Sequence, residues 1–526
     1  MSTLVTPDRI SAAPFVNEPY TDFSQPPNAA KMQAALDKVR GELGKEYDLL
    51  VAGARRKSED KLKSVNPSHP SQFVGTHQKA SHQDATDAIE AAYKYFPTWA
   101  NVPAEERARL LFRVAEIFRE RKFEYDAWLV IEAGKTWAEA EADVSEAIDF
   151  CEYYAREALA LDNPDPLVQL SGERDRLVYL PLGVGIIIPP WNFPLAIMVG
   201  MTTAALVTGN TVVIKPSSDT PTIAAKFAET LIEAGFPPQS FSLLSGSGGA
   251  IGDVLVSHPK TRFVSFTGSR DVGLHINELA AKTPKGQLWI KRVIAEMGGK
   301  DAIIVDSEAD LDQAVPGVMY SAFGYQGQKC SACSRAIVDA SIYDEFLDKL
   351  KAKVEALTVG PSDEFENYMG PVINGRARNV ILKYIETGKQ EGRLITGGTA
   401  APGEGYFVKP TVIADVDSKA TIFQEEIFGP VLAVAKARDF DHALELANDS
   451  EYGLTGAVFT KNREKIDKAS RQFFVGNLYI NRKCTGAMVG AHPFGGFNMS
   501  GTDSKAGGPD YLLQFVQAKS IAEKIA

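Results

Sequence analysis

Cysteine is scarce in this sequence of 526 residues, which contains four cysteines and seven histidines. So few cysteines cannot form a disulfide scaffold in a chain of this length. They are more typical of a reducing compartment, where a thiol can act as a reagent. Only Cys330 and Cys333 lie close together, in the segment C-S-A-C. Because no second pair of this kind is present, we expect no metal site.

The sequence also lacks a long uninterrupted hydrophobic run and an excess of basic residues. Its most apolar stretch, residues 184–207, is broken by PPWNFP at 189–194, whereas a membrane-spanning helix needs about 20 apolar residues. The opening segment MSTLVTPDRISAAPF has no basic part followed by an apolar part, so it does not resemble a signal peptide. The net charge of −11 disfavours binding to nucleic acids or anionic membranes. We therefore expect a cytoplasmic protein that acts on a small molecule, with no nucleic-acid or membrane partner.

The hydrophobic pattern is that of an α/β protein. The apolar runs GVGIIIP, NTVVIKPS, FSLLSG and RFVSFTGS follow one another over residues 183–269, and helical segments such as PTIAAKFAETLIEAGF separate them. A second series, with DAIIVD, SRAIVD and GAVFTK, occupies residues 301–478. This alternation predicts parallel sheets with helices on both faces, and such sheets bind ligands at the carboxyl ends of their strands.

Several other segments have a clear local pattern. Residues 1–30 are rich in Pro, Asn and Ser, and we expect them to lie as an arm over the surface. Hydrophobic periodicity predicts helices over 104–121, 138–159 and 343–357. The segment SGERDRLVYLPLG at 171–183 predicts an exposed strand or hairpin, and exposed strands often pair between subunits.

A thiol and a carboxylate occur in segments suited to covalent catalysis. Cys330 in FGYQGQKCSACSR follows Lys329 in what looks like a helix start, where N–H groups and a cation would lower the thiol pKa. Glu296 in IAEMGGK precedes Gly298 and Gly299, which allow close backbone approach. A cysteine that forms a thioester and a carboxylate that activates water make a coherent pair. Each residue alone is more often an inert buried cysteine or a loop carboxylate.

Three further segments could hold an oxyanion or a phosphate. Asn192 lies between the prolines of PPWNFP, and a rigid amide donor suits a developing oxyanion. The turn FTGSRDVG, with Gly268 and Ser269, can direct N–H groups to a phosphate at a helix start. Lys215 ends the run VVIK and could meet a ribose or a phosphate. Taken singly, each segment also has an ordinary structural interpretation: Asn192 as a turn-forming asparagine, FTGSRDVG as a glycine-rich turn, and Lys215 as a solvent-exposed lysine.

The order of the motifs is distinctive. PWNFP, KPSSDTP, FTGS, EMGGK, GQKC, EEIFGP and PFGGFNMSG follow one another. In this order, and with the spacing between Glu296 and Cys330, they resemble the aldehyde dehydrogenase superfamily over nearly the whole chain. Within it, EAGKTWAEAEADVSEAIDFCEYYA, GQKCSACSR and TGAMVGAHPFGGFNMSGTDSKAGGP are most similar to the family of L-glutamate γ-semialdehyde dehydrogenases.

The resemblance implies a reaction, the oxidation of L-glutamate γ-semialdehyde to L-glutamate in the second step of proline degradation. In that family's mechanism Cys330 attacks the aldehyde, while Asn192 and the N–H group of Cys330 hold the oxyanion. Glu296 then activates the water that hydrolyses the thioester. The substrate would be held by donors to its carboxylate and by two aromatic rings, which correspond here to Ser331, Gly486, Ala487, Phe193 and Phe494.

The resemblance also implies NAD as the cofactor. The corresponding positions line its path or hold its adenosine ribose, pyrophosphate and nicotinamide riboside, and they are Ile188, Pro189, Trp191, Lys215, Gly268, Ser269, Glu426 and Phe428. One position departs from the pattern: many NAD-specific relatives carry a glutamate three residues after the lysine, and this sequence has Ser218 there. A carboxylate would repel a 2′-phosphate and serine would not, so NADP stays open as a second cofactor.

The implied fold is α/β, with three parts. A Rossmann-type NAD(P)-binding domain would comprise residues 1–161 and 182–296, and an α/β catalytic domain residues 297–495. A small β oligomerisation flap would combine residues 162–181 and 496–526. The resemblance further implies a homo-oligomer built from dimers and a functional link with proline dehydrogenase.

Other functions stay open on the sequence alone. The substrate could be another semialdehyde, such as succinic semialdehyde. A CoA-acylating relative is disfavoured because Glu296, the deacylating base, is present. A catalytically silent structural protein on the same fold is disfavoured because Asn192, Glu296 and Cys330 all occur. A hydrolase without a redox role would leave EEIFGP and FTGS without a purpose.

Overall fold

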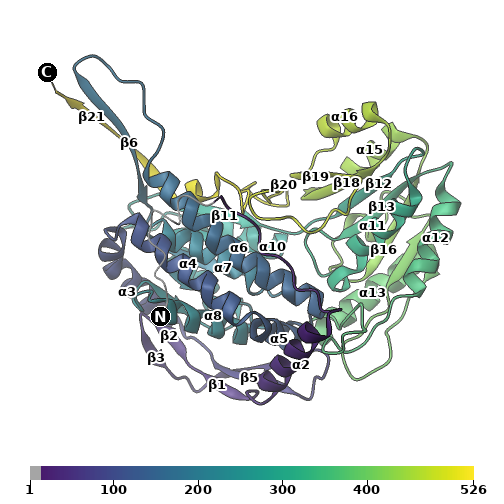
Figure 1. The fold of residues 1–526 in the computed structure, drawn as a ribbon, viewed down its shortest axis with the longest axis horizontal. Coiled ribbons are helices and arrows are strands. Elements are labelled where there is room, and N and C mark those ends of the chain that lie inside the picture. The colour runs from purple at the N-terminus through teal and green to yellow at the C-terminus, as the bar shows by residue number, and fades with distance from the viewer. Residues whose placement is uncertain (1–13, 526) are drawn as a thin grey trace.

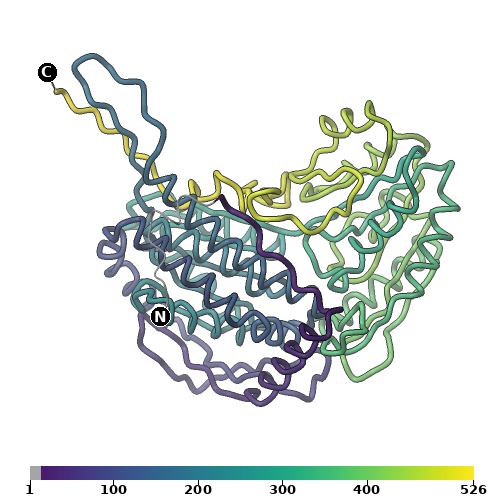
Figure 2. The backbone as a smooth tube through the Cα atoms, viewed as in Figure 1, coloured from purple at the N-terminus to yellow at the C-terminus, as the bar shows by residue number. Residues whose placement is uncertain are grey.

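The computed structural model describes residues 14–525 and consists of two α/β lobes side by side, with a β-ribbon projecting from the first (Figure 1). Residues 1–13 of the predicted arm and residue 526 of the predicted flap lie outside the described residues. The chain builds the first lobe, then the second, and its yellow end returns across the first lobe to the ribbon (Figure 2).

A seven-stranded sheet forms the centre of the first lobe, in the order β11-β10-β7-β8-β9-β2-β3. The five strands from β7 to β11 are parallel, as predicted, and the strand order reverses between β7 and β10. β7 and β8 are buried at every position, which is typical of parallel strands covered on both faces. The strands are β2 (Leu49–Val51), β3 (Ala54–Arg56), β7 (Val184–Ile188), β8 (Thr211–Ile214), β9 (Phe241–Leu243), β10 (Thr261–Thr267) and β11 (Arg292–Glu296).

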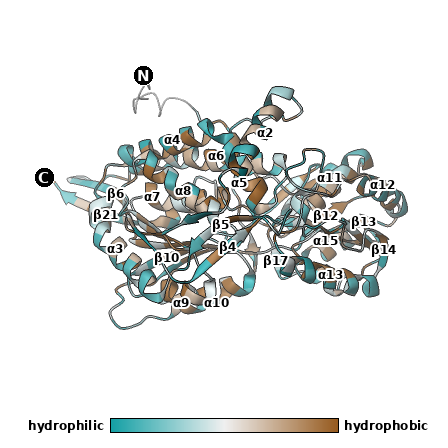
Figure 3. Ribbon diagram, turned by 90° about the horizontal axis from the view of Figure 1, so that it is seen from below, coloured by the Kyte–Doolittle hydropathy of each residue, from teal (hydrophilic) through white to brown (hydrophobic). Residues whose placement is uncertain are grey.

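Helices cover both faces of this sheet (Figure 3). α7 (Ala196–Val207) and α8 (Pro221–Ala234) pack on one face, with α4 (Ala104–Glu120), α5 (Lys122–Ala133) and α6 (Trp137–Asp162) outside them. α3 (His82–Ala100), α9 (Gly248–Ser257) and α10 (Arg270–Ala281) pack on the other face. The helices predicted over 104–121 and 138–159 are confirmed as α4 and α6.

A second seven-stranded sheet, in the order β14-β15-β16-β13-β12-β18-β19, forms the other lobe. All its neighbouring strands are parallel except β14, which pairs antiparallel at one edge. Its strands are β12 (Asp301–Val305), β13 (Cys333–Asp339), β14 (Arg393–Thr396), β15 (Thr411–Ala414), β16 (Val431–Ala437), β18 (Thr455–Phe459) and β19 (Asn477–Ile480). The helices are α11 (Leu311–Phe323), α12 (Tyr343–Glu355), α13 (Gly375–Glu391), α14 (Thr421–Gln424), α15 (Phe440–Asn448) and α16 (Arg463–Gln472).

The projecting ribbon pairs β6 (Glu173–Pro181) antiparallel with β21 (Val516–Lys524). β6 confirms the strand predicted over 171–183. Of the segment 496–526 that was predicted for the flap, β21 alone pairs with β6 among the described residues. The preceding 3₁₀ turn Tyr511–Phe515 is buried in the core of the first lobe, because its aromatic side chains pack there.

The remaining elements are short, apart from α2. α2 (Pro26–Arg40) begins inside the predicted arm of residues 1–30, since prolines are well suited to the first turn of a helix. β1 (Lys45–Tyr47), β5 (Phe73–Gln78) and β4 (Lys61–Val65) form a small sheet, and β17 (Tyr452–Gly453) pairs with β20 (Phe497–Asn498). Among residues 14–525, no helix is both long and apolar enough to span a bilayer.

Candidate active site

A cavity of about 370 Å³ lies beside α6, the carboxyl end of β11 and the turn that precedes β13. It brings together Glu296 and Cys330, which are far apart in the sequence. The five residues predicted to hold the substrate all line it, and they are Phe193, Ser331, Gly486, Ala487 and Phe494. The predicted nucleophile, general base and substrate-binding residues therefore share one space.

Cys330 lies in a turn that leads into β13, and no helix begins there, so the predicted helix start is wrong. Burial raises the pKa of its thiol, and the carboxylates of Asp301 and Glu426 raise it further, whereas the sequence predicted a lowered pKa. Lys329 does not offset this effect, because its ammonium group pairs with Glu139 at 2.6 Å. The thiol therefore carries its proton at neutral pH.

The segment that leads to Cys330 is held in an unusual backbone conformation. Tyr325 and Gln326 have φ angles of 48° and 56°, in the left-handed region that non-glycine residues seldom adopt. The Tyr325 hydroxyl donates to the carbonyl of Ala133 at 2.9 Å, and the Gln326 amide donates to the carbonyl of Pro371 at 2.7 Å. These buried bonds fix a strained turn, as is common at functional sites.

Glu296 is the last residue of β11, and burial raises the pKa of its carboxyl to about 8. The Ser504 hydroxyl donates to its Oε1 atom, a bond that opposes the rise because it favours the ionised form. The Oε2 atom is buried without a hydrogen-bond partner among the described residues. One oxygen of this carboxylate is thus fixed, and the other is left for a ligand or a water.

The segment 500–504 fixes the strand that carries Glu296. The N–H group of Met297 donates to the carbonyl of Ser500 at 2.8 Å, and the N–H group of Thr502 donates to the carbonyl of Ala295 at 2.9 Å. The segment therefore extends the edge of β11 and places Ser504 over the carboxylate.

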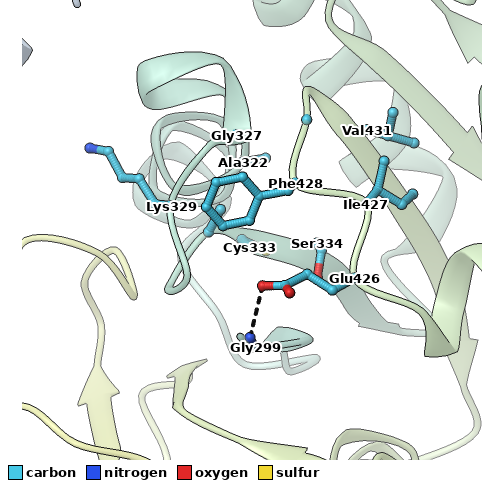
Figure 4. A pocket seen from close by; sticks show the side chains of 12 residues that line it. Gly299, Ala322, Gly327, Lys329, Cys333, Ser334, Glu426, Ile427, Phe428 and Val431 are labelled. Carbon is cyan, nitrogen blue, oxygen red and sulfur yellow. Dashed lines mark hydrogen bonds between the residues drawn. The ribbon is translucent and has the colours of Figure 1, made fainter. Parts of the chain in front are cut away.

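Gly298 and Gly299 allow the close approach that the sequence predicted. A Cβ atom on Gly298 would lie 2.1 Å from the Glu426 carboxylate, and one on Gly299 would lie 2.4 Å from the carbonyl oxygen of Cys330. The N–H group of Gly299 donates to Oε1 of Glu426 at 3.0 Å (Figure 4). Any larger residue would separate Glu426 from the cysteine turn.

Glu426 and Phe428, two of the predicted cofactor residues, line a small hollow of about 20 Å³ beside Gly299 and Lys329 (Figure 4). The ring of Trp191 contacts that of Phe428 edge-on, with their centroids 5.3 Å apart. The structure thus brings together three predicted cofactor residues from segments distant in the sequence.

Asn192 is buried and lies against the same turn. Its side-chain amide donates to the carbonyl of Gln328 at 3.0 Å, two residues before Cys330. An amide group has a second N–H, so this bond orients Asn192 without using all of its donors.

The other predicted cofactor residues follow the carboxyl ends of the first sheet. Ile188 ends β7, Pro189 follows it, and Lys215 follows β8. The Lys215 ammonium and the Ser218 hydroxyl both donate to the carbonyl of Gly246, at 3.4 and 3.1 Å. Gly268 and Ser269 connect β10 to α10, and β10 is the strand next to β7 at which the strand order reverses. Burial lowers the pKa of Lys215 to about 8.

Sequence reasoning missed an acidic wall of the cavity on α6. Glu139, Glu146 and Asp149 line the cavity, and burial raises the pKa of Glu146 to about 8 and that of Asp149 to about 6. Their spacing along α6 follows the helical repeat, which could have indicated one acidic face. Tyr20 also lines the cavity, and no local pattern of the arm pointed to it.

Comparisons with known proteins agree with one another. Residues 54–521 match the aldehyde dehydrogenase family. The chain is 57% identical to the 1-pyrroline-5-carboxylate dehydrogenase of Geobacillus thermodenitrificans, over 97% of this chain and 99% of that protein. It is similar to the structure of 1-pyrroline-5-carboxylate dehydrogenase from Thermus with bound NAD, with a TM-score of 0.96, 49% identity, and 98% and 99% of the two chains covered.

A longer protein is similar as well. Proline utilization A from Bdellovibrio bacteriovorus matches 97% of this chain, with a TM-score of 0.96 and 44% identity. The match covers 53% of that protein.

Proposed function

The chain belongs to the aldehyde dehydrogenase family, and from this membership we propose that it oxidises L-glutamate γ-semialdehyde to L-glutamate with NAD. The semialdehyde is in equilibrium with 1-pyrroline-5-carboxylate, the compound named in the relatives. The observation that carries the proposal is the single cavity that holds Cys330, Glu296 and the five substrate-binding candidates.

Cys330 carries the first step. The thiol of Cys330 passes its proton to solvent water, its Sγ atom bonds to the aldehyde carbon, and the carbonyl π electrons move onto the oxygen, which becomes an oxyanion. The free N–H of the Asn192 amide and the N–H group of Cys330 stabilise this oxyanion. The strained turn at Tyr325 and Gln326 matters here, because it fixes the position of the sulfur relative to these donors.

Glu296 carries the second step. Its Oε2 atom, which has no partner among residues 14–525, accepts a proton from water. Loss of a hydride from the adduct on Cys330 would leave a thioester, and the oxygen of this water then bonds to the thioester carbon. The sulfur of Cys330 leaves as a thiolate, which regains a proton, and the acid is released. The carboxylate must be ionised for this role, so its raised pKa limits the rate below about pH 8.

Three donors in the cavity suit the carboxylate of the substrate. The Ser331 hydroxyl and the N–H groups of Gly486 and Ala487 have no hydrogen-bond partner in the part of the chain that the structure describes. Donors left unpaired in a cavity favour a ligand with strong acceptors. On the acidic wall of α6, Asp149 stays ionised at neutral pH and provides negative charge for the substrate's ammonium group, whereas the raised pKa of Glu146 keeps that carboxyl largely protonated.

The residues present fit NAD. Ser269 at the start of α10 makes no side-chain capping bond, which leaves first-turn N–H groups for the pyrophosphate. Lys215 and Ser218, which both donate to the carbonyl of Gly246, would meet the adenosine ribose, and Glu426 and Phe428 would hold the nicotinamide riboside. When bound, NAD accepts the hydride that the substrate gives up.

Substrate preference tests the proposed function. We expect kcat/KM for glutamate γ-semialdehyde to exceed that for hexanal or succinic semialdehyde by about 10² or more. Hexanal has no carboxylate to pair with the donors of the cavity, and succinic semialdehyde has no ammonium group to pair with its acidic wall. NADH absorbance with each aldehyde measures this ratio, and Ser331→Ala should reduce it mainly through KM. If kcat/KM for hexanal equalled that for glutamate γ-semialdehyde, the protein would still be an aldehyde dehydrogenase, but the proposed substrate would be wrong.

Ser218→Glu should shift the cofactor preference toward NAD. The added carboxylate can bind the ribose hydroxyls of NAD but repels the 2′-phosphate of NADP. The ratio of kcat/KM for the two cofactors, measured in both proteins, reports the effect, and Ser218→Gln serves as an uncharged control. If Ser218→Glu left the ratio unchanged, Ser218 would not be at the ribose.

Location and assembly complete the proposal. The four cysteines are all free thiols, which supports a reducing, cytoplasmic location. The ribbon of β6 and β21 presents strand edges that support a homo-oligomer built from dimers, with the NAD-binding and catalytic domains in the two lobes. The similarity to proline utilization A supports a functional link with proline dehydrogenase.

A further inference from the structure

The described part of the N-terminal arm lies across the substrate cavity. Residues 15–23, here called the strap, precede α2 and run beside α6 (Figure 1). Phe15 packs edge-on against Tyr153 and Phe23 edge-on against Trp137, with ring centroids 5.2 and 5.4 Å apart. The strap is therefore fixed by aromatic contacts to the first residue of α6 and to Tyr153 in the second half of that helix.

Hydrogen bonds hold the middle of the strap to the carboxylates of α6. The N–H group of Glu18 donates to Asp149 at 2.7 Å, and the Asn17 amide donates to the other oxygen of the same carboxylate at 2.8 Å. The N–H group of Thr21 donates to Glu141 at 2.9 Å. Each bond joins the strap to a charged acceptor, and such bonds are among the stronger ones in proteins.

The strap also reaches residues 486–489, here called the substrate loop, which line the same cavity. The Asn17 amide donates to the carbonyl of Val489 at 3.0 Å, and the Tyr20 hydroxyl donates to Sδ of Met488 at 3.5 Å. Met488 directly follows Gly486 and Ala487, whose N–H groups are the proposed donors to the substrate carboxylate. The strap thus bridges α6 and this loop.

We propose that Tyr20 is a specificity residue, whose hydroxyl turns from Met488 to the substrate carboxylate held at Gly486 and Ala487. The inference rests on the proposed function. A thioether is a weak acceptor and a carboxylate is a strong one, so the exchange of partners is favourable.

The charge around Tyr20 keeps it a donor. Burial and the carboxylates of Glu146 and Asp149 raise the pKa of its phenol to about 12. The hydroxyl therefore stays protonated throughout the working pH range. Tyr20 lines the cavity and is 57% exposed, so its hydroxyl has room to change partner.

Two variants separate the roles of the hydroxyl and the ring. We expect Tyr20→Phe to lower kcat/KM for glutamate γ-semialdehyde about tenfold or more, through KM, and to leave hexanal oxidation unchanged, because hexanal has no carboxylate. Tyr20→Ala, which also removes the ring, should lower kcat/KM for the semialdehyde further than Tyr20→Phe does. Tyr93→Phe, a tyrosine of α3 outside the cavity lining, is the matched control.

A binding measurement provides a second readout. L-glutamate should inhibit hexanal oxidation competitively, and Tyr20→Phe should weaken that inhibition by the same factor. If Tyr20→Phe leaves both quantities as in the wild type, or slows both aldehydes equally, the role of Tyr20 is wrong while the proposed function stands. If the wild type itself does not prefer glutamate γ-semialdehyde over hexanal, both the role of Tyr20 and the proposed function are wrong.

Discussion

Cys330→Ala will produce no NADH from any aldehyde above about 0.1% of the wild-type rate, while it still binds NAD. The substitution removes the only thiol that lines the substrate cavity within the described chain, and it removes little volume. Protein fluorescence quenched by NAD measures cofactor binding, and NADH absorbance measures turnover.

Cys151→Ala is the matched control for this loss. Cys151 is fully buried in α6 and is not among the residues that line the cavity, so its replacement should cost some stability and leave kcat near the wild-type value. Substantial turnover by Cys330→Ala would show that Cys330 is not the nucleophile.

Glu296→Gln should give a rapid burst of about one NADH per active site and then a steady rate at least about 10²-fold below that of the wild type. Glutamine keeps the shape and can accept the Ser504 hydrogen bond, but it cannot take a proton from water. Acylation therefore continues and deacylation stalls. Rapid mixing with a saturating aldehyde measures both phases.

The pH dependence sharpens this test. Because burial raises the pKa of Glu296 to about 8, the ionised base increases with pH and the wild-type steady rate should rise through that value. Ser504→Ala should move this rise to higher pH, since the lost hydroxyl favoured the ionised form. Fast steady turnover by Glu296→Gln without a burst would contradict the general-base role.

The sequence predicted the sheets well because their patterns are local. Continuous apolar runs such as that of β7 need helices on both faces, and this requirement indicates parallel strands before any contact is known. The order of the motifs likewise predicted, through the family resemblance, that Glu296 and Cys330 act together, and both line one cavity.

Contacts between distant segments were not predictable in the same way. The lowered thiol pKa predicted for Cys330 was wrong, because Glu139 neutralises Lys329 and burial dominates. No pattern near Ser504 or Tyr20 indicates their contacts with Glu296 and Met488. Such pairs depend on how whole elements pack, which a short window of sequence does not encode.

The contact of segment 500–504 with β11 also bears on the order in which the protein is made. A ribosome delivers Glu296 long before Ser504, and domains that fold during synthesis use only what has emerged. The strands of the first sheet, β2 to β11, are all synthesised early. The general base Glu296 at the end of β11 is not held in place until segment 500–504 has been synthesised. An unfinished chain would therefore lack both the segment that holds Glu296 and the 3₁₀ turn Tyr511–Phe515 of the first lobe's core, so the active site is completed only after the translation of this late segment.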